Sequence, residues 1–397
     1  MKTFLERIML VFQGGLALSS GYLVGLLVAA RGCDRSPPRQ MAEQTLDLAV
    51  IVPAHDEEPG IGATLDSLAR CEYPSEHRRT VVIADNCGDR TADRAREAGV
   101  EVWERTDPEH RGKGFALAWA LERLFAEEAA PDAVVVVDAD CTVSPNLLRA
   151  ISRRLGAGAE AIQVDYVAGN PEDSPTAALR FAGFALADTV RFLGKERLGL
   201  SCGLVGTGMA FGREVLERAP WTVTGLVEDG EYHMRLVLAG TRTQFVPEAW
   251  VSQAVPTTLR ASTEQQARWE KGRLEMIRAW CPRLLGAGLA RRDPVRFHAG
   301  IECLVPPQSM LALGGGAGIL IGALRGKRLL LSLSLLTLSG QAGFVLGGLR
   351  LVRAPASVYR ALLMAPVLIA AKLGLYARFL AGGGPSGWVR TEREARP

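Results

Sequence analysis

Three long uncharged stretches flank a polar middle segment in this 397-residue chain. Residues 8–30, 304–324 and 329–349 contain no charged side chain. At about 1.5 Å per residue, each is long enough to cross a hydrocarbon core of about 30 Å as a helix. The pattern predicts one membrane-spanning helix near the N-terminus and a helical hairpin near the other end. Pro306 and Pro307 could kink the first helix of the hairpin.

A signal peptide is the alternative interpretation of the first stretch, residues 8–30. The apolar core of a signal peptide is usually about 7–15 residues long and precedes a small-residue cleavage site. Residues 8–30 are longer, and Arg31 follows them directly. We therefore expect an uncleaved helix, with a linker over residues 31–44.

A fourth apolar stretch, residues 358–380, carries Arg360, Lys372 and Arg378. A lysine at mid-depth is costly in hydrocarbon, and the three cations could lie along one side of a helix. We expect an interfacial amphipathic helix here, with a fourth membrane span as the alternative.

The basic residues around these helices give a weak and contradictory signal for orientation. Arg31, Arg35 and Arg39 follow the first helix and favour a cytoplasmic location for its C-terminal end. The basic link at 325–328 would then face outward, against the positive-inside rule. Orientation therefore depends on the function of the polar segment.

The polar segment, residues 41–300, alternates short apolar runs with helical patterns. The runs at 46–53, 80–85 and 133–138 are rich in Val and Ile, as expected of strands buried on both faces of a parallel sheet. The helical patterns lie at 61–70, 91–98 and 114–126. This alternation predicts an α/β fold that binds ligands at the C-terminal ends of its strands.

Acidic residues follow the predicted strands. Asp138 and Asp140 come after four consecutive valines, and the two-residue period of a strand would point both carboxylates to one side. Such a pair suits Mg²⁺ or Mn²⁺, with a diphosphate completing the coordination shell; a polar strand end is the alternative. Asp85 ends another strand and can accept hydrogen bonds from a nucleobase or ribose, whereas Asp89 and Thr91 fit a helix cap.

Lys113, Glu228 and Asp229 are further candidates for chemistry. Lys113 lies between two glycines that allow backbone to approach a phosphate, although residues 111–114 lack the Walker A pattern and could be a simple turn. Glu228 and Asp229 open a helical run over 230–239. The helix N-terminus would lower the pKa of these carboxylates, and nearby strand-end carboxylates would raise it. Helix capping is the alternative role.

A polar helix is expected over residues 263–280. Gln265 and Trp269 are four residues apart and share a face of this helix, with Arg268 beside them. A tryptophan next to Gln and Arg can stack on a sugar ring and bond its hydroxyls. Packing against the membrane surface is the alternative, and both roles are compatible.

Composition excludes other classes of protein. The formal net charge of +3, from 46 basic and 43 acidic residues, gives no support for a nucleic-acid partner. The seven cysteines are scattered without CxxC spacing, which argues against a disulfide framework or a structural zinc site.

In this order, the motifs resemble membrane-bound, inverting family 2 glycosyltransferases of the cellulose synthase, hyaluronan synthase and poly-N-acetylglucosamine synthase kind. The resemblance runs from about residue 46 to residue 269 and extends into the C-terminal helices. It rests on Pro53-Ala54-His55-Asp56-Glu57-Glu58, Asp85, Gly112-Lys113-Gly114, Asp138-Ala139-Asp140, Gly206-Thr207-Gly208, Glu228-Asp229, Gln265-Gln266-Ala267-Arg268-Trp269 and Trp388-Val389-Arg390-Thr391. Two positions depart from the family pattern: Asp56 replaces Asn, and Val227 stands where Thr is usual.

The resemblance implies a GT-A fold, an α/β nucleotide-diphospho-sugar transferase fold, with transmembrane helices at both ends. The implied donor-binding residues are Pro53, Ala54, Glu57, Asp85, Lys113, Asp138 and Arg390. The implied acceptor-binding residues are Gly206, Thr207, Gly208, Gln265, Gln266, Arg268 and Trp269. Asp229 and Glu228 are the implied catalytic pair, with Asp229 as the base, and Asp138 and Asp140 would hold Mg²⁺ or Mn²⁺.

By the same resemblance, the chain transfers a sugar from a UDP-sugar, with inversion, to a polysaccharide at the plasma membrane. A lipid-linked acceptor is the alternative, and a partner subunit could assist export through the lipid bilayer. The expected division is a first helix and linker at 1–40, a cytoplasmic catalytic domain with interfacial helices at 41–300, a transmembrane hairpin at 301–350 and a helix with tail at 351–397.

Two readings from other classes fit less well. A sugar-nucleotide-sensing scaffold would not need Asp140 or Asp229, and both are present. A nucleotidyltransferase would use Asp-x-Asp and a basic turn, but it would not need the Gln-x-x-Arg-Trp pattern or membrane helices.

Overall fold

The computed structural model of the chain describes residues 2–33, 44–225 and 227–366. Side chains are described in these ranges except at residues 2–3, 5 and 259–271. Most of the expected linker at 31–44, most of the apolar stretch at 358–380, and the tail with Arg390 lie outside the described residues. The same holds for the side chains of Gln265, Gln266, Arg268 and Trp269.

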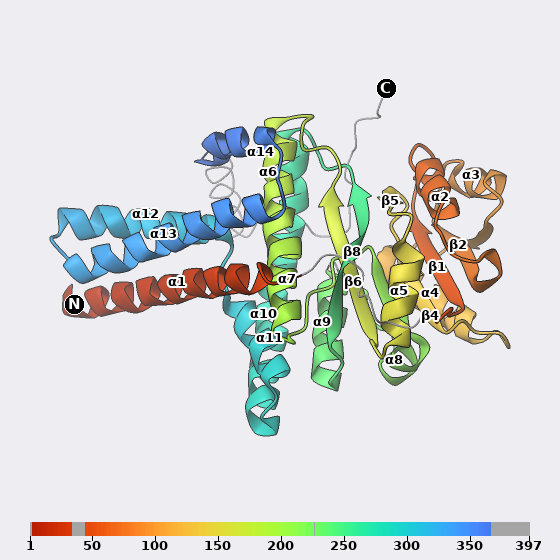
Figure 1. Ribbon diagram of the computed structural model, residues 1–397, viewed down its shortest axis with the longest axis horizontal. Helices are drawn as coiled ribbons and strands as arrows, with labels where there is room; N and C mark the ends of the chain where they lie inside the picture. Colours follow the sequence, from red (N-terminus) through yellow and green to blue (C-terminus); the bar gives the residue numbers. More distant parts are fainter. Residues whose placement is uncertain (1, 34–43, 226, 367–397) are drawn as a thin grey trace.

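An eight-stranded mixed sheet forms the centre of the polar segment (Figure 1). Its strands follow the order β3-β2-β1-β4-β7-β6-β8-β5. Their bounds are β1 Leu48–Ala54, β2 Arg78–Asp85, β3 Glu101–Arg105, β4 Ala133–Val136, β5 Cys141–Val143, β6 Ala161–Ala168, β7 Met209–Gly212 and β8 Thr243–Gln253.

The first half of the sheet is parallel, as the apolar runs predict. β1 pairs in parallel with β2 and with β4, and β2 pairs in parallel with β3. Val50, Ile51 and Val52 of β1 have no exposed surface, because helices cover both faces of the sheet. The expected α/β architecture and its three strands are confirmed.

The covering helices alternate with these strands along the chain. One face carries α2 Ile61–Ala69, α3 Thr91–Glu97 and α5 Leu147–Gly156. The other carries α4 Lys113–Phe125, α8 Arg213–Arg218 and α9 Glu228–Ala239. The helices predicted at 61–70, 91–98 and 114–126 are therefore confirmed as α2, α3 and α4.

The second half of the sheet is mixed. β7 runs antiparallel to both β4 and β6, whereas β8 is parallel to β6 and antiparallel to β5. A long helical segment follows β6, comprising α6 Pro175–Phe184, a π-helical stretch Ala185–Val190 and α7 Arg191–Arg197. In Figure 1, α6 and α7 lie between the sheet and the apolar helices.

Apolar helices project from the domain on the side away from β1 and β2 (Figure 1). α1 Lys2–Ala30 and α13 Arg328–Leu351 each contain a stretch long and apolar enough to cross a membrane. α11 Pro294–Leu304 and α12 Gln308–Leu324 form a further candidate, a pair bent by 59°. The break between them contains Pro306 and Pro307, so the expected kink is confirmed. The short remainder of the described chain includes α14 Ala356–Ala361.

α1, α12 and α13 pack closely because glycines lie at their contacts. A Cβ atom would come within 2.3 Å of Leu16 Cδ1 at Gly314, within 2.1 Å of Ser334 Oγ at Gly318, and within 2.5 Å of Ser20 Oγ at Gly340. A larger side chain at any of these positions would force the helices apart. The three helices therefore form a closely packed bundle at these contacts.

A buried ionic cluster joins the apolar helices to the domain. Lys195 of α7 is 1% exposed, and its Nζ donates to both carboxylate oxygens of Glu302 on α11, at 2.9 and 3.0 Å. Arg191 pairs with the same carboxylate. The hydroxyl of Tyr22 on α1 lies 3.0 Å from His298 Nε2 on α11. These contacts tie α1, α7 and α11 together.

Candidate active site

The two carboxylates expected to bind a metal lie just beyond β4. Because β4 ends at Val136, Asp138 and Asp140 occupy the turn between β4 and β5, and the expectation that they lie on a strand is wrong. They still converge, because ligand atoms of Asp138, Asp140 and Cys141 lie within 4.8 Å of one another. The turn, not the period of a strand, brings the carboxylates together.

Two of these three groups suit a hard divalent cation. Carboxylate oxygens are ligands that Mg²⁺ and Mn²⁺ favour. Cys141 is fully buried, and burial raises the pKa of its thiol, so the sulfur stays protonated and is a poor ligand. Asp138 and Asp140 therefore fit the donor set of such an ion.

Lys113 connects this turn to the glycine turn at 206–208. Its ammonium pairs with Asp138 and donates to the carbonyl oxygen of Gly206 at 2.6 Å. Burial lowers the pKa of Lys113, but the neighbouring carboxylates of Asp138, Glu228 and Asp229 outweigh burial and raise it. The lysine is therefore a fixed positive charge among carboxylates.

Glu228 and Asp229 begin α9, as predicted, and lie beside Lys113. A Cβ atom on Gly206 would lie 3.4 Å from both Asp229 Oδ2 and Lys113 Nζ. Burial raises the pKa of Asp229, although the Gly230 N–H, which donates to Asp229 Oδ1 at 2.7 Å, and the charge on Lys113 both lower it. Burial and Asp229 together raise the pKa of Glu228 to about 7.

The cause of the raised pKa values of Glu228 and Asp229 differs from the one expected from the sequence. The sequence predicts a competition between the helix N-terminus and nearby strand-end carboxylates. In the structure, burial is the largest cause for both residues, and Asp138 is a smaller one. A raised pKa makes a carboxylate a better proton acceptor near neutral pH, which suits a general base.

The opening motif lies at the same edge of the sheet. Pro53 and Ala54 end β1, and Glu57 follows in the next loop. A Cβ atom on Gly60 would lie 3.8 Å from Glu57 Oε2 and 3.8 Å from Asp140 Cβ. The carboxylate of Glu57 is therefore close to the turn that carries Asp140.

Asp85 ends β2, two strands from β4 and about 10 Å away at ordinary strand spacing. Its Oδ1 accepts from Arg105 Nη1 at 2.6 Å and from Asn86 Nδ2 at 3.0 Å, and its carbonyl oxygen lies 2.7 Å from His55 Nδ1. Sequence reasoning missed Arg105, whose position opposite Asp85 depends on the register of β2 and β3. No local signal in the sequence marks that pair.

The glycine turn at 206–208 is partly a support structure. Gly206 faces Lys113 and Asp229, but Thr207 is 2% exposed and its Oγ1 accepts from the Asp138 N–H at 3.1 Å. Gln163 Nε2 donates to the carbonyl oxygen of Thr207 at 2.9 Å. Gln163 was also missed, although a glutamine inside an apolar strand run is a sequence signal for a buried polar contact.

Gly208 has no space for a side chain. A Cβ atom there would lie 2.5 Å from Val164 Cγ2 and 2.9 Å from Val251 Cγ2. Its φ of +65° also favours glycine. The structure thus gives Gly208 a packing role, and the acceptor roles of residues 206–208 stay predictions.

α10 Leu259–Arg291 packs against the start of α9, where Glu228 and Asp229 lie. A Cβ atom on Gly272 would lie 2.6 Å from Val227 Cγ1, and one on Gly230 would lie 3.1 Å from Met276 Cε. Arg273 Nη2 donates to the carbonyl oxygen of Val305 at 2.8 Å, at the break between α11 and α12. The helix expected at 263–280 is confirmed, is longer than predicted, and links the site to the bent apolar pair.

We expect Gly206→Ala to reduce turnover by about 10²-fold, because displacing catalytic groups by about 1 Å has effects of this size. The positive φ of Gly206 strains a side chain at this position, and relief of that strain would move the Gly206 carbonyl oxygen, which accepts from Lys113 beside Asp229. Gly158→Ala is the matched control, since Gly158 also has positive φ, +95° against +87°, but no atom within 4 Å of the added Cβ. Both variants should lose about 1–2 kcal/mol of stability. Steady-state kinetics and thermal unfolding would measure both effects, and equal turnover in the two variants would contradict this placement.

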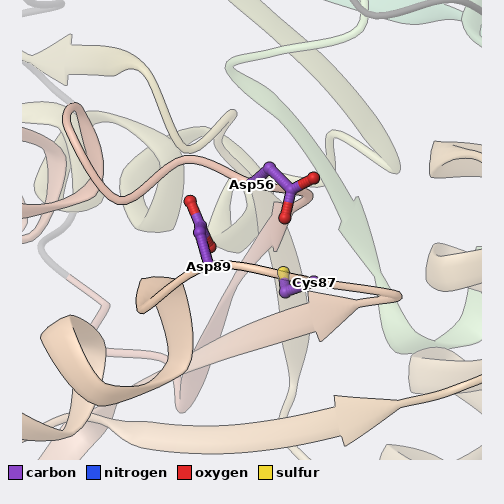
Figure 2. Close-up of side chains that lie close together, drawn as sticks. All are labelled: Asp56, Cys87 and Asp89. Atoms are coloured by element: carbon purple, nitrogen blue, oxygen red, sulfur yellow. The ribbon is translucent and has the colours of Figure 1, made fainter.

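A second cluster lies in the loops after β1 and β2, where Asp56, Cys87 and Asp89 face one another (Figure 2). Asp56 Oδ1 accepts from the Gly88 N–H at 2.7 Å, and Asp89 Oδ1 accepts from the Thr91 N–H at 3.0 Å. The cluster therefore connects two loops and caps α3. Asp56 has a φ of +54°, and Asn and Asp both tolerate this region, which explains why Asp can replace the usual Asn.

A family described as glycosyltransferase-like family 2 matches residues 46–272. The chain belongs to this family. The expected GT-A-like mixed α/β fold is confirmed by the match and by the sheet. The matched residues include all the motifs of the sheet edge and those of the first part of α10, so the family assignment covers the whole candidate site except Arg390.

Several curated proteins are similar to this family 2 glycosyltransferase. It is 28% identical over 244 residues to a probable glycosyltransferase, YdaM, of Bacillus subtilis, covering 59% of this chain and 57% of that protein. It is 31% identical over 224 residues to a dolichyl-phosphate hexose transferase of Haloferax volcanii, covering 55% of this chain and 90% of that protein. An N-acetylglucosaminyltransferase of Rhizobium meliloti is 28% identical over 243 residues, covering 56% and 54% of the two chains. The chain thus spans little more than half of the Bacillus and Rhizobium relatives.

Among solved structures, a mannosyltransferase of Pyrobaculum calidifontis in complex with GDP-mannose and Mn²⁺ aligns with a TM-score of 0.48. The two chains are 18% identical, and the alignment covers 83% of this chain and 98% of the other.

Proposed function

We propose that this glycosyltransferase transfers a sugar from a UDP-sugar, with inversion at the anomeric carbon, to an acceptor hydroxyl near the membrane. The observation that carries the proposal is the convergence of two kinds of carboxylate around Lys113. Lys113 pairs with Asp138, which converges with Asp140. Asp229, with its raised pKa, lies beside the glycine turn at Gly206 that Lys113 also contacts. The pair of Asp138 and Asp140 suits a leaving diphosphate, and Asp229 suits a base.

The proposed reaction is a single displacement. Asp229 takes the proton of the acceptor hydroxyl, whose oxygen forms a bond to C1 of the sugar as the bond from C1 to the UDP oxygen breaks. Lys113 adds positive charge beside the departing diphosphate. Mg²⁺ or Mn²⁺ held by Asp138 and Asp140 would supply Lewis-acid stabilisation of that leaving group. Asp85, about 10 Å from Asp138, would bind the nucleoside.

The remaining assignments extend the same site. Pro53, Ala54, Glu57 and Arg390 would complete the donor side. Gly206, Gln265, Gln266, Arg268 and Trp269 would form the acceptor side, with Glu228 next to the base. Because UDP-sugars are made in the cytosol, the domain would face the cytoplasm at the plasma membrane, with α1, α12 and α13 in the bilayer and the bend between α11 and α12 at its boundary.

The acceptor is either a polysaccharide or a lipid-linked molecule, and the packing of α1, α12 and α13 favours the second. Glycine contacts bring these three described helices close together, which leaves no path for a sugar chain at those points. A polysaccharide would need a path made with a partner subunit. A lipid-linked acceptor needs only to present its hydroxyl near α10 and the break after Leu304.

A donor panel with purified full-length protein in detergent tests this function. We expect one UDP-sugar to release UDP in the presence of membrane lipids and Mn²⁺, and we expect EDTA to stop release until excess Mn²⁺ is added. The labelled product should enter the organic phase, and its anomeric configuration should be opposite to that of the donor. Release that is unaffected by EDTA would contradict the metal site, and a long water-soluble product would favour polysaccharide synthesis.

A further inference from the structure

Asp140 has a cross-strand neighbour that the family motifs do not include. β5 begins at Cys141, directly after Asp140, and β5 pairs with β8 so that Cys141 is opposite Gln253. Gln253 is the last residue of β8. Its side chain therefore stands next to the turn that carries the proposed metal carboxylates.

The hydrogen bonds fix the orientation of the Gln253 amide. Gln253 Nε2 donates to Asp140 Oδ2 at 2.7 Å, and Gln253 Oε1 accepts from the hydroxyl of Tyr166 at 2.6 Å. An ionised carboxylate can only accept hydrogen bonds, and an amide nitrogen can only donate them. A flipped amide would place its oxygen against the carboxylate oxygen of Asp140, so this orientation is the one that satisfies both contacts.

Tyr166 is itself held in place. It lies on β6, is 7% exposed, and its ring packs edge-on against Phe184 with centroids 5.0 Å apart and planes at 88°. Burial raises the pKa of its phenol well above the usual value, so the hydroxyl keeps its proton. The hydrogen bonds therefore run from the rigid phenol of Tyr166 to the amide of Gln253, and from that amide to the carboxylate of Asp140.

The two proposed metal ligands are thus oriented in different ways. Asp138 is paired with the cation of Lys113, which partly neutralises it. Gln253 gives Asp140 a neutral donor, which directs the carboxylate without neutralising it. A carboxylate oriented in this way keeps its negative charge for a divalent cation.

We propose that Gln253 and Tyr166 are positioning residues that orient Asp140 for a divalent cation in the donor site. This inference rests on the proposed function, because it assumes that Asp140 is a metal ligand. Neither residue would touch the reacting atoms, and their effect would pass through Asp140. Hydrogen-bond partners of metal ligands commonly contribute about 10–100-fold to metal affinity.

The test is the affinity of the full-length protein for Mn²⁺ in the presence of UDP, measured by the electron paramagnetic resonance signal of free Mn²⁺. Gln253→Met keeps the length of the side chain but removes both hydrogen bonds, and we expect it to weaken Mn²⁺ binding about 10-fold or more. Tyr166→Phe keeps the ring packing but frees the Gln253 amide to rotate. We expect a smaller loss of Mn²⁺ affinity than in Gln253→Met, because the amide can still donate to Asp140. In the double variant, Tyr166→Phe should add nothing to Gln253→Met, since the phenol acts through the amide.

Two controls are needed for the relay, the hydrogen bonds from Tyr166 through Gln253 to Asp140. One tests for a general loss of structure, and the other tests the metal site itself. Tyr73→Phe removes a hydroxyl bonded to Leu46 and Ser152 in another part of the domain, and it should leave Mn²⁺ affinity unchanged. Asp140→Asn should abolish tight Mn²⁺ binding. If Asp140→Asn has no effect, the proposed metal site is wrong. If Asp140→Asn acts but folded Gln253→Met and Tyr166→Phe bind Mn²⁺ like the natural protein, the relay alone is overturned.

Discussion

Replacing Asp229 with asparagine is expected to lower turnover by about 10²–10⁴-fold, the usual contribution of a positioned general base. The amide fills nearly the same space but cannot accept the proton of an acceptor hydroxyl. Binding of the UDP-sugar should change little, because the donor contacts proposed here lie around Asp138 and Asp85. UDP release during turnover and calorimetric titration with UDP would measure the two effects separately.

Asp66→Asn is a control for the loss of one carboxylate, since Asp66 is exposed on α2. It should leave turnover unchanged. Near-normal turnover by Asp229→Asn would remove the base assignment. Loss of UDP binding in that variant would instead move Asp229 to the donor side.

The same residue predicts a pH dependence. A general base acts as a carboxylate, so turnover should fall as the pH falls through its pKa. Burial raises the pKa of Asp229 and raises that of Glu228 to about 7, so the fall should occur at a higher pH than for an ordinary aspartate. Because the two carboxylates interact, the acid limb belongs to the pair rather than to one residue. A profile that stays flat down to pH 4 would contradict this.

Glu302→Gln is expected to lower the free energy of unfolding by about 3–5 kcal/mol, the usual result of removing one partner of a buried ion pair. Glu302 is the common partner of Lys195 and Arg191. Without the negative charge of Glu302, the ammonium group of Lys195, which is 1% exposed, would lose the carboxylate that pairs with it. Unfolding in detergent by heat or denaturant would measure the loss.

Glu97→Gln is the matched control for Glu302→Gln. Glu97 pairs with Arg90 and Arg94 on the exposed side of α3, and exposed pairs are usually worth less than about 1 kcal/mol. Equal losses in the two variants would mean that the cluster between α7 and α11 does not stabilise the fold.

The parallel half of the sheet was predictable because its strands are buried on both faces. Short runs of β-branched residues such as 134–137 favour a central strand over a buried helix, and α2, α3 and α4 follow from the helical patterns between them. The mixed half was not predicted, since β5 has three residues and β8 mixes buried and partly buried positions without a regular alternation. Patterns of that kind do not fix which strands become neighbours.

The candidate site likewise contains residues that were predictable from the sequence and residues that were not. Asp138, Asp140, Lys113 and Asp229 were predictable because each lies in a short motif with recognisable chemistry. Gln253 and Arg105 were not, because each becomes relevant only through strand register with a distant residue. The cause of the raised pKa of Asp229 was also missed, since burial depends on the packing of α10 against the start of α9.

α10 contacts both the start of α9, which carries the candidate base, and the bend between the apolar helices α11 and α12. One stretch of this helix rests on Val227 and Gly230, and Arg273 in the same stretch holds the carbonyl of Val305. These contacts therefore set the distance between the start of α9, with Glu228 and Asp229, and the bend between α11 and α12. Under the proposed function, an acceptor hydroxyl that reaches Asp229 must stand at that distance from the bend, so the fold would select acceptors by the distance between their reactive group and their point of attachment in the membrane.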